Sequence, residues 1–277
     1  MDKRAKILSF LQGKYYFTKD SDFDKMIEYF EKRYILPLKK RVDIRDKVLL
    51  DVSCGFGWMA FAFLKQGGKF AYGLDTHKFS VDSANRIAKI LSLDKKCSFD
   101  VGDIEKLPFK DKSVDFFSCL ETLEHVENQK AALHEMARVT QDYVVIETPN
   151  GLFPKDTHNT GLILGNYVPK CVRRAYVKLR KKPDDLDTMT RVMNPFTIER
   201  GLKGFKVVSE MEAFDSIADW VKSRPYYMPY GLGKNTFKPR INTKSKKYLV
   251  LSKLYALIGN RIRFVLPAYI AVLRRVK

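Results

Sequence analysis

The first half of the chain alternates between apolar runs and stretches in which apolar residues recur at helical spacing. The runs predict strands at Val48–Val52, Lys69–Asp75, Cys97–Asp103, Val114–Leu120 and Tyr143–Pro149. Helices are expected between them over residues 57–66, 80–91 and 122–138. Apolar strands that alternate with helices are typical of a parallel sheet with helices on both faces. The pattern therefore predicts an α/β domain.

Helical spacing also marks the residues before the first strand. Phe23, Met26, Ile27, Phe30 and Tyr34 fall on one face of a helix, which Pro37 is expected to end. Residues 1–46 are therefore assigned to a helical leader.

The second half departs from this alternation. Residues 151–193 are expected to form a helical insert, after which a helix and a strand at about Phe205–Phe214 resume the pattern. Lys246–Lys253 is expected to be a last, antiparallel strand, and residues 254–277 one or two helices broken at Pro267. The main domain is thus placed at residues 47–253, with a basic apolar helical tail after it.

A glycine turn, "SCGFG", separates the first predicted strand from the first helix. This arrangement presents backbone N–H groups to a nucleotide-like ligand. Gly55 and Gly57, followed by Ala60, also match the turn that binds a dinucleotide. The turn alone therefore leaves the ligand open.

Acidic residues near the ends of the strands indicate which ligand the glycine turn binds. Asp51, at the end of the first strand, suits a ligand that carries an ammonium group. Asp75 closes the second strand, 18 residues after Gly57, where an acid accepts hydrogen bonds from ribose hydroxyls. Asp103 and Ile104 follow the third strand and suit an adenine held by one acceptor and an apolar face. An amine, a ribose and an adenine together describe S-adenosylmethionine.

Four motifs then occur in the order in which a known family has them: "LLDVSCGFGW", "AYGLD", "VGDIEKLPFKDKSVDFFSCLETLEHV" and "ETPN". On these motifs, over about Val48–Phe214, the chain resembles class I S-adenosylmethionine-dependent methyltransferases. The matching branch includes enzymes of ubiquinone and menaquinone biosynthesis. The resemblance implies a Rossmann-like, seven-stranded, mostly parallel sheet whose last strand is antiparallel, with S-adenosylmethionine as cofactor. Ser53 stands where the family has its first glycine, and we interpret this as a mild variation.

We predict cofactor contacts around these strand ends. The predicted residues are Asp51, Ser53, Cys54, Gly55, Gly57, Asp75, Thr76, Asp103, Ile104, Leu120 and Glu121. The alternatives are a turn needed only for packing at the glycines, and helix caps at the aspartates. Glu121 is alternatively a charge that favours the start of a helix.

Two histidines are candidate catalytic residues. Methyl transfer depends mainly on the alignment of the two reactants, and a general base is needed only when the acceptor must lose a proton. His125 is the first candidate, with a role at the helix start as the alternative. His158, after the fifth strand, is the second, with a loop-stabilising role as the alternative.

The leader also carries an aromatic group, Tyr15, Tyr16 and Phe17. The resemblance implies that the leader folds over the cofactor as a lid. The alternative is an aromatic contact that only packs the leader onto the core.

The net charge of +19 is unevenly distributed. Residues 1–150 hold 25 basic and 23 acidic side chains, whereas residues 222–277 hold 14 basic and no acidic ones. The insert is also basic, and apolar stretches with basic flanks suit an anionic membrane surface. The alternative is packing of these segments on the domain or on a second subunit.

The four cysteines show no metal-binding spacing. Reduced thiols, no metal site and a cytoplasmic location are therefore expected. No apolar run is long enough for a simple membrane-spanning helix.

These observations favour a methyltransferase that acts on a small or lipid-linked acceptor at the membrane surface, most simply at a hydroxyl oxygen. A second hypothesis keeps the enzyme but gives it a soluble glycan or secondary metabolite, with the tail in a homodimer contact. A third, an RNA-binding or RNA-modifying protein, ranks lowest because no RNA-binding module is recognised.

Overall fold

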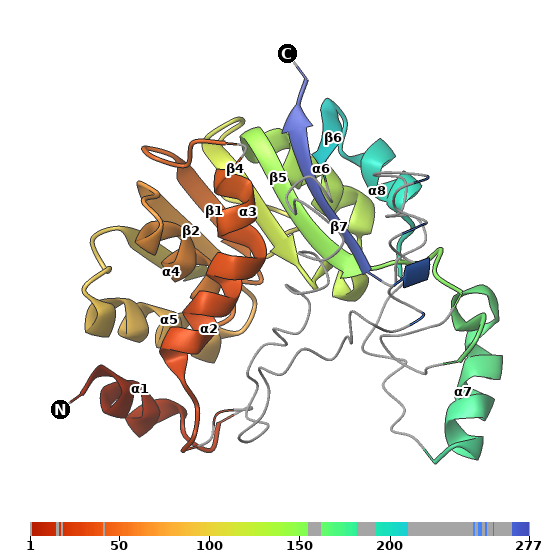
Figure 1. The fold of residues 1–277 in the computed structure, drawn as a ribbon, viewed down its shortest axis with the longest axis horizontal. Helices are drawn as coiled ribbons and strands as arrows, with labels where there is room; N and C mark the ends of the chain where they lie inside the picture. The colour runs from red at the N-terminus through yellow and green to blue at the C-terminus, as the bar shows by residue number, and fades with distance from the viewer. Residues whose placement is uncertain are drawn as a thin grey trace.

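The computed structural model describes residues 2–14, 17, 19–40, 42–154, 162–181, 192–209 and 268–276, with positions 246, 249, 250, 253 and 257. Its centre is a seven-stranded sheet in the order β3-β2-β1-β4-β5-β7-β6 (Figure 1). The strands are β1 (Val48–Val52), β2 (Phe70–Asp75), β3 (Cys97–Val101), β4 (Val114–Leu120), β5 (Thr140–Pro149), β6 (Phe205–Ser209) and β7 (Ala268–Arg275). The first five strands are parallel, and β7 is antiparallel to both β5 and β6. The predicted seven-stranded α/β sheet is confirmed.

The antiparallel strand comes from a part of the chain that the sequence pattern assigned to the helical tail. Ala268–Arg275 is a strand and not a helix, whereas Lys246, Leu249, Val250 and Lys253 are helical and not a strand. The reason is visible in the alternating burial of β7: Tyr269, Ala271 and Leu273 are fully buried in the hydrophobic cluster on one face of the sheet, while the side chains between them are half-buried. A short apolar run fits either element until its neighbours are known.

Helices cover both faces of the sheet. One hydrophobic cluster joins the sheet to α1 (Lys3–Leu11), α2 (Phe23–Phe30), α4 (Trp58–Lys65) and α5 (Lys78–Leu91). A second cluster joins the opposite face to α6 (Gln129–Val139) and α8 (Pro195–Gly201). Successive strand residues alternate between the two clusters, as in Leu49 and Leu50. The insert contributes the short η3 turn (Gly165–Tyr167) and α7 (Lys170–Leu179).

The leader helix does not end at Pro37. After α2 the chain widens into a π-helical turn, η1 (Glu31–Ile35), and continues as α3 (Leu36–Lys39). Pro37 lies within the first two positions of α3, where a missing N–H is tolerated. The expectation that this proline stops the helix is therefore wrong.

The leader packs on the sheet through aromatic rings. The rings of Phe17 and Phe56 lie edge to face with centroids 4.7 Å apart, and Phe23 stacks on Trp58 at 5.8 Å. Phe56 and Trp58 flank Gly57 in the glycine turn. The leader therefore lies beside this turn, as a lid or a packing contact would require.

Candidate active site

The predicted site residues gather at the carboxyl edge of the sheet, where the strand order reverses. β1 pairs with β2 on one side and with β4 on the other, so the loops after these strands diverge above β1. A crevice at such a point is the usual ligand site of an open parallel sheet. The residues that follow β1, β2, β3 and β4 are therefore considered together.

The turn after β1 depends on backbone conformations that glycine adopts most easily. Gly55 and Gly57 have φ values of 52° and 83°. A Cβ atom on Gly57 would lie 2.7 Å from the Phe99 ring, whereas one on Gly55 would meet no atom within 4 Å. Gly57 is thus required for packing, and Gly55 borders open space. Ser53 also has a positive φ, 55°, which costs a serine about 1 kcal/mol and explains why a glycine suits this position.

Asp75, at the end of β2, is bound directly to the glycine turn. Its Oδ2 accepts a hydrogen bond from the amide of Gly55 at 2.9 Å, and its Oδ1 accepts one from the amide of His77 at 2.8 Å. The carboxylate is buried, yet each oxygen keeps a second lone pair for a further donor. Asp75 is therefore held at the turn with accepting capacity to spare.

Asp51 is a buried carboxyl one strand away. Its Oδ1 accepts a hydrogen bond of 2.6 Å from Oγ of Ser118 on β4. Burial raises the pKa of Asp51 to about 7, the Ser118 hydrogen bond lowers it, and the charge of Asp75 raises it. A positive ligand group beside Asp51 would restore the charged form.

The loop after β3 presents an exposed Asp103 next to a buried Ile104. One oxygen of Asp103 accepts a hydrogen bond from the amide of Glu105 at 2.9 Å, which closes a tight turn. The acidic side chain is therefore open to solvent, while the apolar side chain next to it in sequence is buried.

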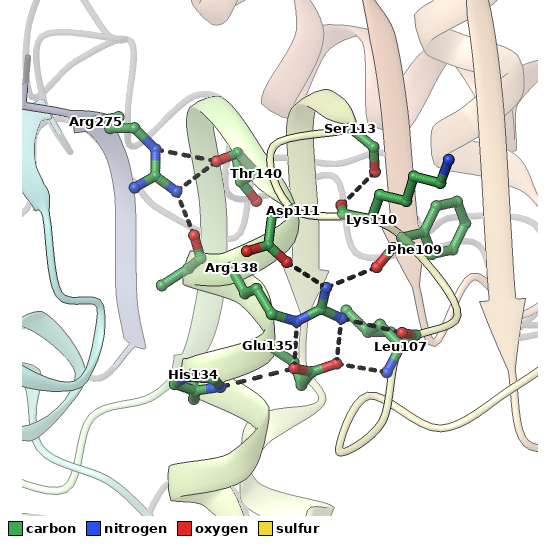
Figure 2. Close-up of polar contacts among 11 residues, drawn as sticks. Leu107, Phe109, Lys110, Asp111, Ser113, His134, Glu135, Arg138, Thr140 and Arg275 are labelled. Atoms are coloured by element: carbon green, nitrogen blue, oxygen red, sulfur yellow. Dashed lines mark hydrogen bonds and ion pairs between the residues drawn. The ribbon is translucent and has the colours of Figure 1, made fainter.

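Arg138 on α6 fixes the later part of this loop (Figure 2). Its guanidinium donates to the carbonyl oxygens of Phe109 and Leu107 at 2.7 and 3.1 Å. It also donates twice to Glu135, each time at 2.7 Å, and once to Asp111 at 2.9 Å. Glu135 in turn accepts the amide of Leu107 at 2.8 Å. One arginine thus ties the loop between β3 and β4 to α6.

The ends of β4 and β5 hold a polar network that the sequence reading missed in large part. Glu147 on β5 is buried and accepts hydrogen bonds from the Arg33 guanidinium, including one of 3.1 Å from Nε, and from the Tyr34 hydroxyl. The carbonyl oxygen of Glu147 accepts the amide of Glu121 at 2.7 Å. The pairing of Arg33 with Glu147 joins residues 114 positions apart, and no local sequence pattern predicts it.

Glu124 completes this network from the η2 turn (Leu123–His125), which precedes α6. Its fully buried carboxyl accepts the Thr148 hydroxyl at 2.9 Å. A single helix over residues 122–138 was expected, and the structure has this separate turn instead. The "LEH" segment therefore turns its glutamate inward.

The remaining predicted residues lie in varied surroundings. The Cys54 thiol is buried, which raises its pKa, while Thr76 and His125 are exposed and Leu120 is half-buried. His158, Tyr15 and Tyr16 lie outside the described residues. Of the two candidate catalytic histidines, the structure therefore places only His125, which is exposed at the end of the η2 turn after β4. No group of three or more acidic, cysteine or histidine side chains among the described residues is arranged to hold a metal ion.

The chain is similar to known methyltransferases. Residues 50–145 match a family described as "Methyltransferase domain". Norajmaline N-methyltransferase of Rauvolfia serpentina is 38% identical over 95 residues, which cover 34% of this chain and 32% of that protein. A probable chloroplastic tocopherol O-methyltransferase of Oryza sativa subsp. japonica is 30% identical over 95 residues, covering 34% and 26%. The chain thus matches less than half of the length of either relative.

A solved S-adenosylmethionine dependent methyltransferase from Mesorhizobium loti shares the fold. Its TM-score is 0.53 at 15% identity, covering 88% of this chain and 98% of that chain. The similarity extends beyond the segment matched in sequence. The overall arrangement of the fold is therefore shared.

Proposed function

Residues 50–145 form a class I S-adenosylmethionine-dependent methyltransferase domain, and from this premise we propose that the chain transfers a methyl group from S-adenosylmethionine to a small-molecule acceptor. The observation that carries the proposal is the hydrogen bond from the Gly55 amide to Asp75, which brings two strand ends together at the crevice. A nucleoside can bind there, because Asp75 can accept its hydrogen bonds and the open space beside Gly55 can accommodate it.

The residues of this edge fit the methyl donor. Asp75 has free lone pairs for two ribose hydroxyls, and Gly55 leaves space for the ligand backbone. Asp51 supplies a buried carboxyl for the ammonium group, and Asp103 with Ile104 supplies an acceptor and an apolar surface for adenine. The donor itself supplies an activated methyl group on a sulfonium, so the protein has mainly to align the reactants.

We assign the acceptor to the other side of the crevice, at the ends of β4 and β5. Polar side chains converge there from three elements: Arg33 from the leader, Glu124 from η2 and Glu147 from β5. His125, exposed beside them, remains a candidate base for an acceptor hydroxyl. The leader is thus proposed to build one wall of the acceptor site.

The surface around α7 supports an amphiphilic acceptor. Residues 162–181 carry six basic side chains and no acidic one. Their exposed apolar side chains are Ile163, Leu164, Tyr167, Val172 and Leu179, with exposed fractions from 47% to 79%. α7 lies apart from the sheet beyond the carboxyl end of β5, at the edge that carries the site (Figure 1). A basic helix with exposed apolar residues favours an anionic lipid surface.

A membrane contact of this kind would lie on the bilayer rather than cross it. Within the described part of the chain, no helix has both the length and the apolar character needed to span a membrane. β7 belongs to the sheet, so Ala268–Arg275 does not take part in the contact that the sequence assigned to the tail.

Sedimentation with lipid vesicles tests this contact. The protein is expected to sediment with vesicles that contain phosphatidylglycerol and not with pure phosphatidylcholine. Lys178→Glu with Lys181→Glu should weaken binding several-fold, whereas Lys3→Glu with Lys6→Glu, the same charge change on α1, should not. Equal loss in both variants would contradict a role specific to α7.

A soluble secondary metabolite is the second candidate acceptor. The name of the relative from Rauvolfia serpentina, norajmaline N-methyltransferase, favours a small nitrogen-containing molecule. Transfer of a labelled methyl group from S-adenosylmethionine to a lipid extract and to a soluble extract separates the two. Label in lipid supports the amphiphilic acceptor, label in soluble products supports the metabolite, and label in neither contradicts the proposed activity on small molecules.

A further inference from the structure

Trp58 carries a buried polar atom that the described part of the chain leaves without a partner. Its side chain is 3% exposed, and its indole nitrogen Nε1 has no hydrogen-bond partner among the described residues. An indole N–H can only donate, and burying a donor without an acceptor costs a folded protein stability. A native fold that keeps such an atom calls for an explanation, and a bound ligand supplies one.

Trp58 lies directly beside the proposed methyl-donor site. It is the first residue of α4 and follows Gly57, which ends the glycine turn. Its ring stacks on Phe23 of α2 at 5.8 Å and lies edge to face with Phe17 at 6.4 Å, measured between ring centroids. The indole is therefore enclosed between the start of α4 and the leader.

The start of α4 is suited to a negatively charged group. The first hydrogen bond of the helix runs from the Phe61 amide to the Gly57 carbonyl oxygen at 2.9 Å, so the three amides before it have no acceptor within the helix. Gly57 has no side chain that could cap them, and the first turn contains no acidic residue. The three positions, Trp58, Met59 and Ala60, are all buried. A buried and uncapped helix start favours an anion.

The methyl donor brings one carboxylate, on the same carbon that bears its ammonium group. With the ammonium group at Asp51, as proposed above, the carboxylate reaches the turn after β1, which leads into α4. The segment Val48–Leu64 contains no basic side chain that could pair with it. Uncharged N–H donors are therefore the groups that this segment offers to the carboxylate.

We propose that the indole N–H of Trp58, together with the amides at the start of α4, binds the carboxylate of the methyl donor. This inference rests on the proposed function and adds a residue that selects the donor by its amino-acid part. The aromatic surroundings strengthen the contact, because a hydrogen bond is stronger where water is excluded. Trp58 thus binds the donor and takes no part in the transfer of the methyl group.

Calorimetric titration of the full chain with two ligands tests this contact. S-Adenosylhomocysteine carries the carboxylate, whereas its decarboxylated form keeps the adenosine, the thioether and the amine and lacks only that group. The wild type is expected to prefer S-adenosylhomocysteine. Trp58→Phe keeps an aromatic ring without the N–H, and the preference should fall about tenfold or more, as for the loss of a hydrogen bond to a charged group.

Phe23→Leu is the matched control for packing. Phe23 contacts the same indole and has no polar side-chain atom, so its substitution should preserve the preference between the two ligands even if both affinities fall. An equal loss of affinity for both ligands in Trp58→Phe would show that the ring only packs, and would overturn the inference. Unchanged affinities in Trp58→Phe would overturn it as well.

A spectroscopic measurement on the tryptophan itself stands even if Trp58→Phe does not fold. The sequence has two tryptophans, Trp58 and Trp220, so Trp220→Phe leaves the indole N–H signal of Trp58 in a proton–nitrogen correlation spectrum. This signal should move downfield with S-adenosylhomocysteine and clearly less with the decarboxylated form. The same response to both ligands would contradict a hydrogen bond to the carboxylate.

These outcomes separate the inference from the proposed function. Binding of both ligands without any dependence on Trp58 would overturn the inference and leave the proposed function intact. Failure of S-adenosylhomocysteine to bind the wild type would overturn both.

Discussion

The amide of Gly55 donates a hydrogen bond of 2.9 Å to Oδ2 of Asp75, 20 residues later in the chain. This bond joins the turn after β1 to the end of β2 and fixes the position of the turn relative to that strand end. Because the other Asp75 oxygen binds the His77 amide, the carboxylate cannot turn away without breaking two hydrogen bonds. The methyl-donor site proposed here depends on this arrangement.

Replacing Asp51 by asparagine should stabilise the protein while weakening its binding of S-adenosylhomocysteine. Burial raises the pKa of Asp51 from 3.8 to about 7, so ionisation costs the folded state stability. That loss begins above the unfolded value and is complete once the pH exceeds about 7. Asp51→Asn should therefore add up to about 4 kcal/mol to the unfolding free energy at pH 8, and little at pH 4.

Urea unfolding at the two pH values measures the stability change, and calorimetry measures an expected loss of affinity of about tenfold or more. Asp115→Asn is the matched control. Its carboxylate accepts hydrogen bonds from the Val48 amide and Lys47 at 2.8 and 3.0 Å, so its loss should destabilise the protein. Destabilisation by Asp51→Asn at pH 8 would contradict the prediction.

The two glycines of the turn should respond differently to alanine. Gly57→Ala combines a φ of 83° with a Cβ 2.7 Å from Phe99, and we expect a loss of about 2–4 kcal/mol. Gly55→Ala meets no neighbouring atom and should lose only about 1 kcal/mol. It should instead weaken S-adenosylhomocysteine binding, because the new methyl group projects into the proposed site. Comparable stability losses, with ligand affinity unchanged in Gly55→Ala, would refute this distinction.

Breaking the pair between Arg33 and Glu147 should detach the leader from the acceptor side. Both side chains are buried, and removal of one partner leaves an uncompensated charge that costs about 3–5 kcal/mol. Arg33→Met and Glu147→Gln should each show this loss in chemical unfolding, and the double variant should lose less than the sum. Arg45→Ala, which breaks an exposed pair with Asp43, should leave stability nearly unchanged, because water and salt screen exposed ion pairs. Additive losses would show that the two residues do not act together.

Arg138→Ala should loosen the loop that carries Asp103 and Ile104. The substitution removes two hydrogen bonds to loop carbonyl oxygens, so we expect lower affinity for S-adenosylhomocysteine and a loss of about 1–3 kcal/mol. Increased amide hydrogen exchange over residues 103–110 would identify the loop as the affected part. Unchanged exchange there would contradict the role assigned to Arg138.

The same contact predicts a dependence on pH. The Arg138 hydrogen bonds lower the pKa of Glu135 from its usual 4.5. A lowered carboxyl pKa contributes stability that is fully present above the unfolded value and is lost as the pH falls through the folded one. Glu135→Gln should therefore reduce the acid sensitivity of unfolding between pH 5 and 3, relative to wild type. An identical pH profile for the two proteins would count against this linkage.

Local patterns in the sequence were sufficient to predict the part of the fold that carries the proposed methyl-donor site. β1 and β4 begin and end where the apolar runs predict, since both strands are buried on each side. Asp51, Gly55 and Asp75 could be placed together because carboxyl ends of parallel strands share one edge. An antiparallel last strand was expected, but at Lys246–Lys253 rather than at Ala268–Arg275.

The features of the fold that the sequence did not predict depend on contacts between residues far apart in the chain. β7 alternates buried and half-exposed side chains because its pairing with β5 and β6 directs Tyr269, Ala271 and Leu273 into the hydrophobic cluster on one face of the sheet. Nothing in the sequence distinguishes Arg33 from the other basic residues of the leader. Its pairing with Glu147 depends on the π-helical turn in which it lies. Glu124 was included in a helix, whereas the fold places it in a turn against Thr148. Each of these features requires tertiary structure that periodicity does not encode.

The most direct test of the methyl-donor site is calorimetric titration of S-adenosylhomocysteine into the wild-type protein and into Asp75→Asn. Asp100→Asn, an exposed aspartate on the neighbouring strand β3, serves as the control. We predict one site per chain in the wild type and the control, and an affinity about 10–100-fold lower in Asp75→Asn. No binding to the wild type, or equal binding to all three proteins, would contradict the site described here.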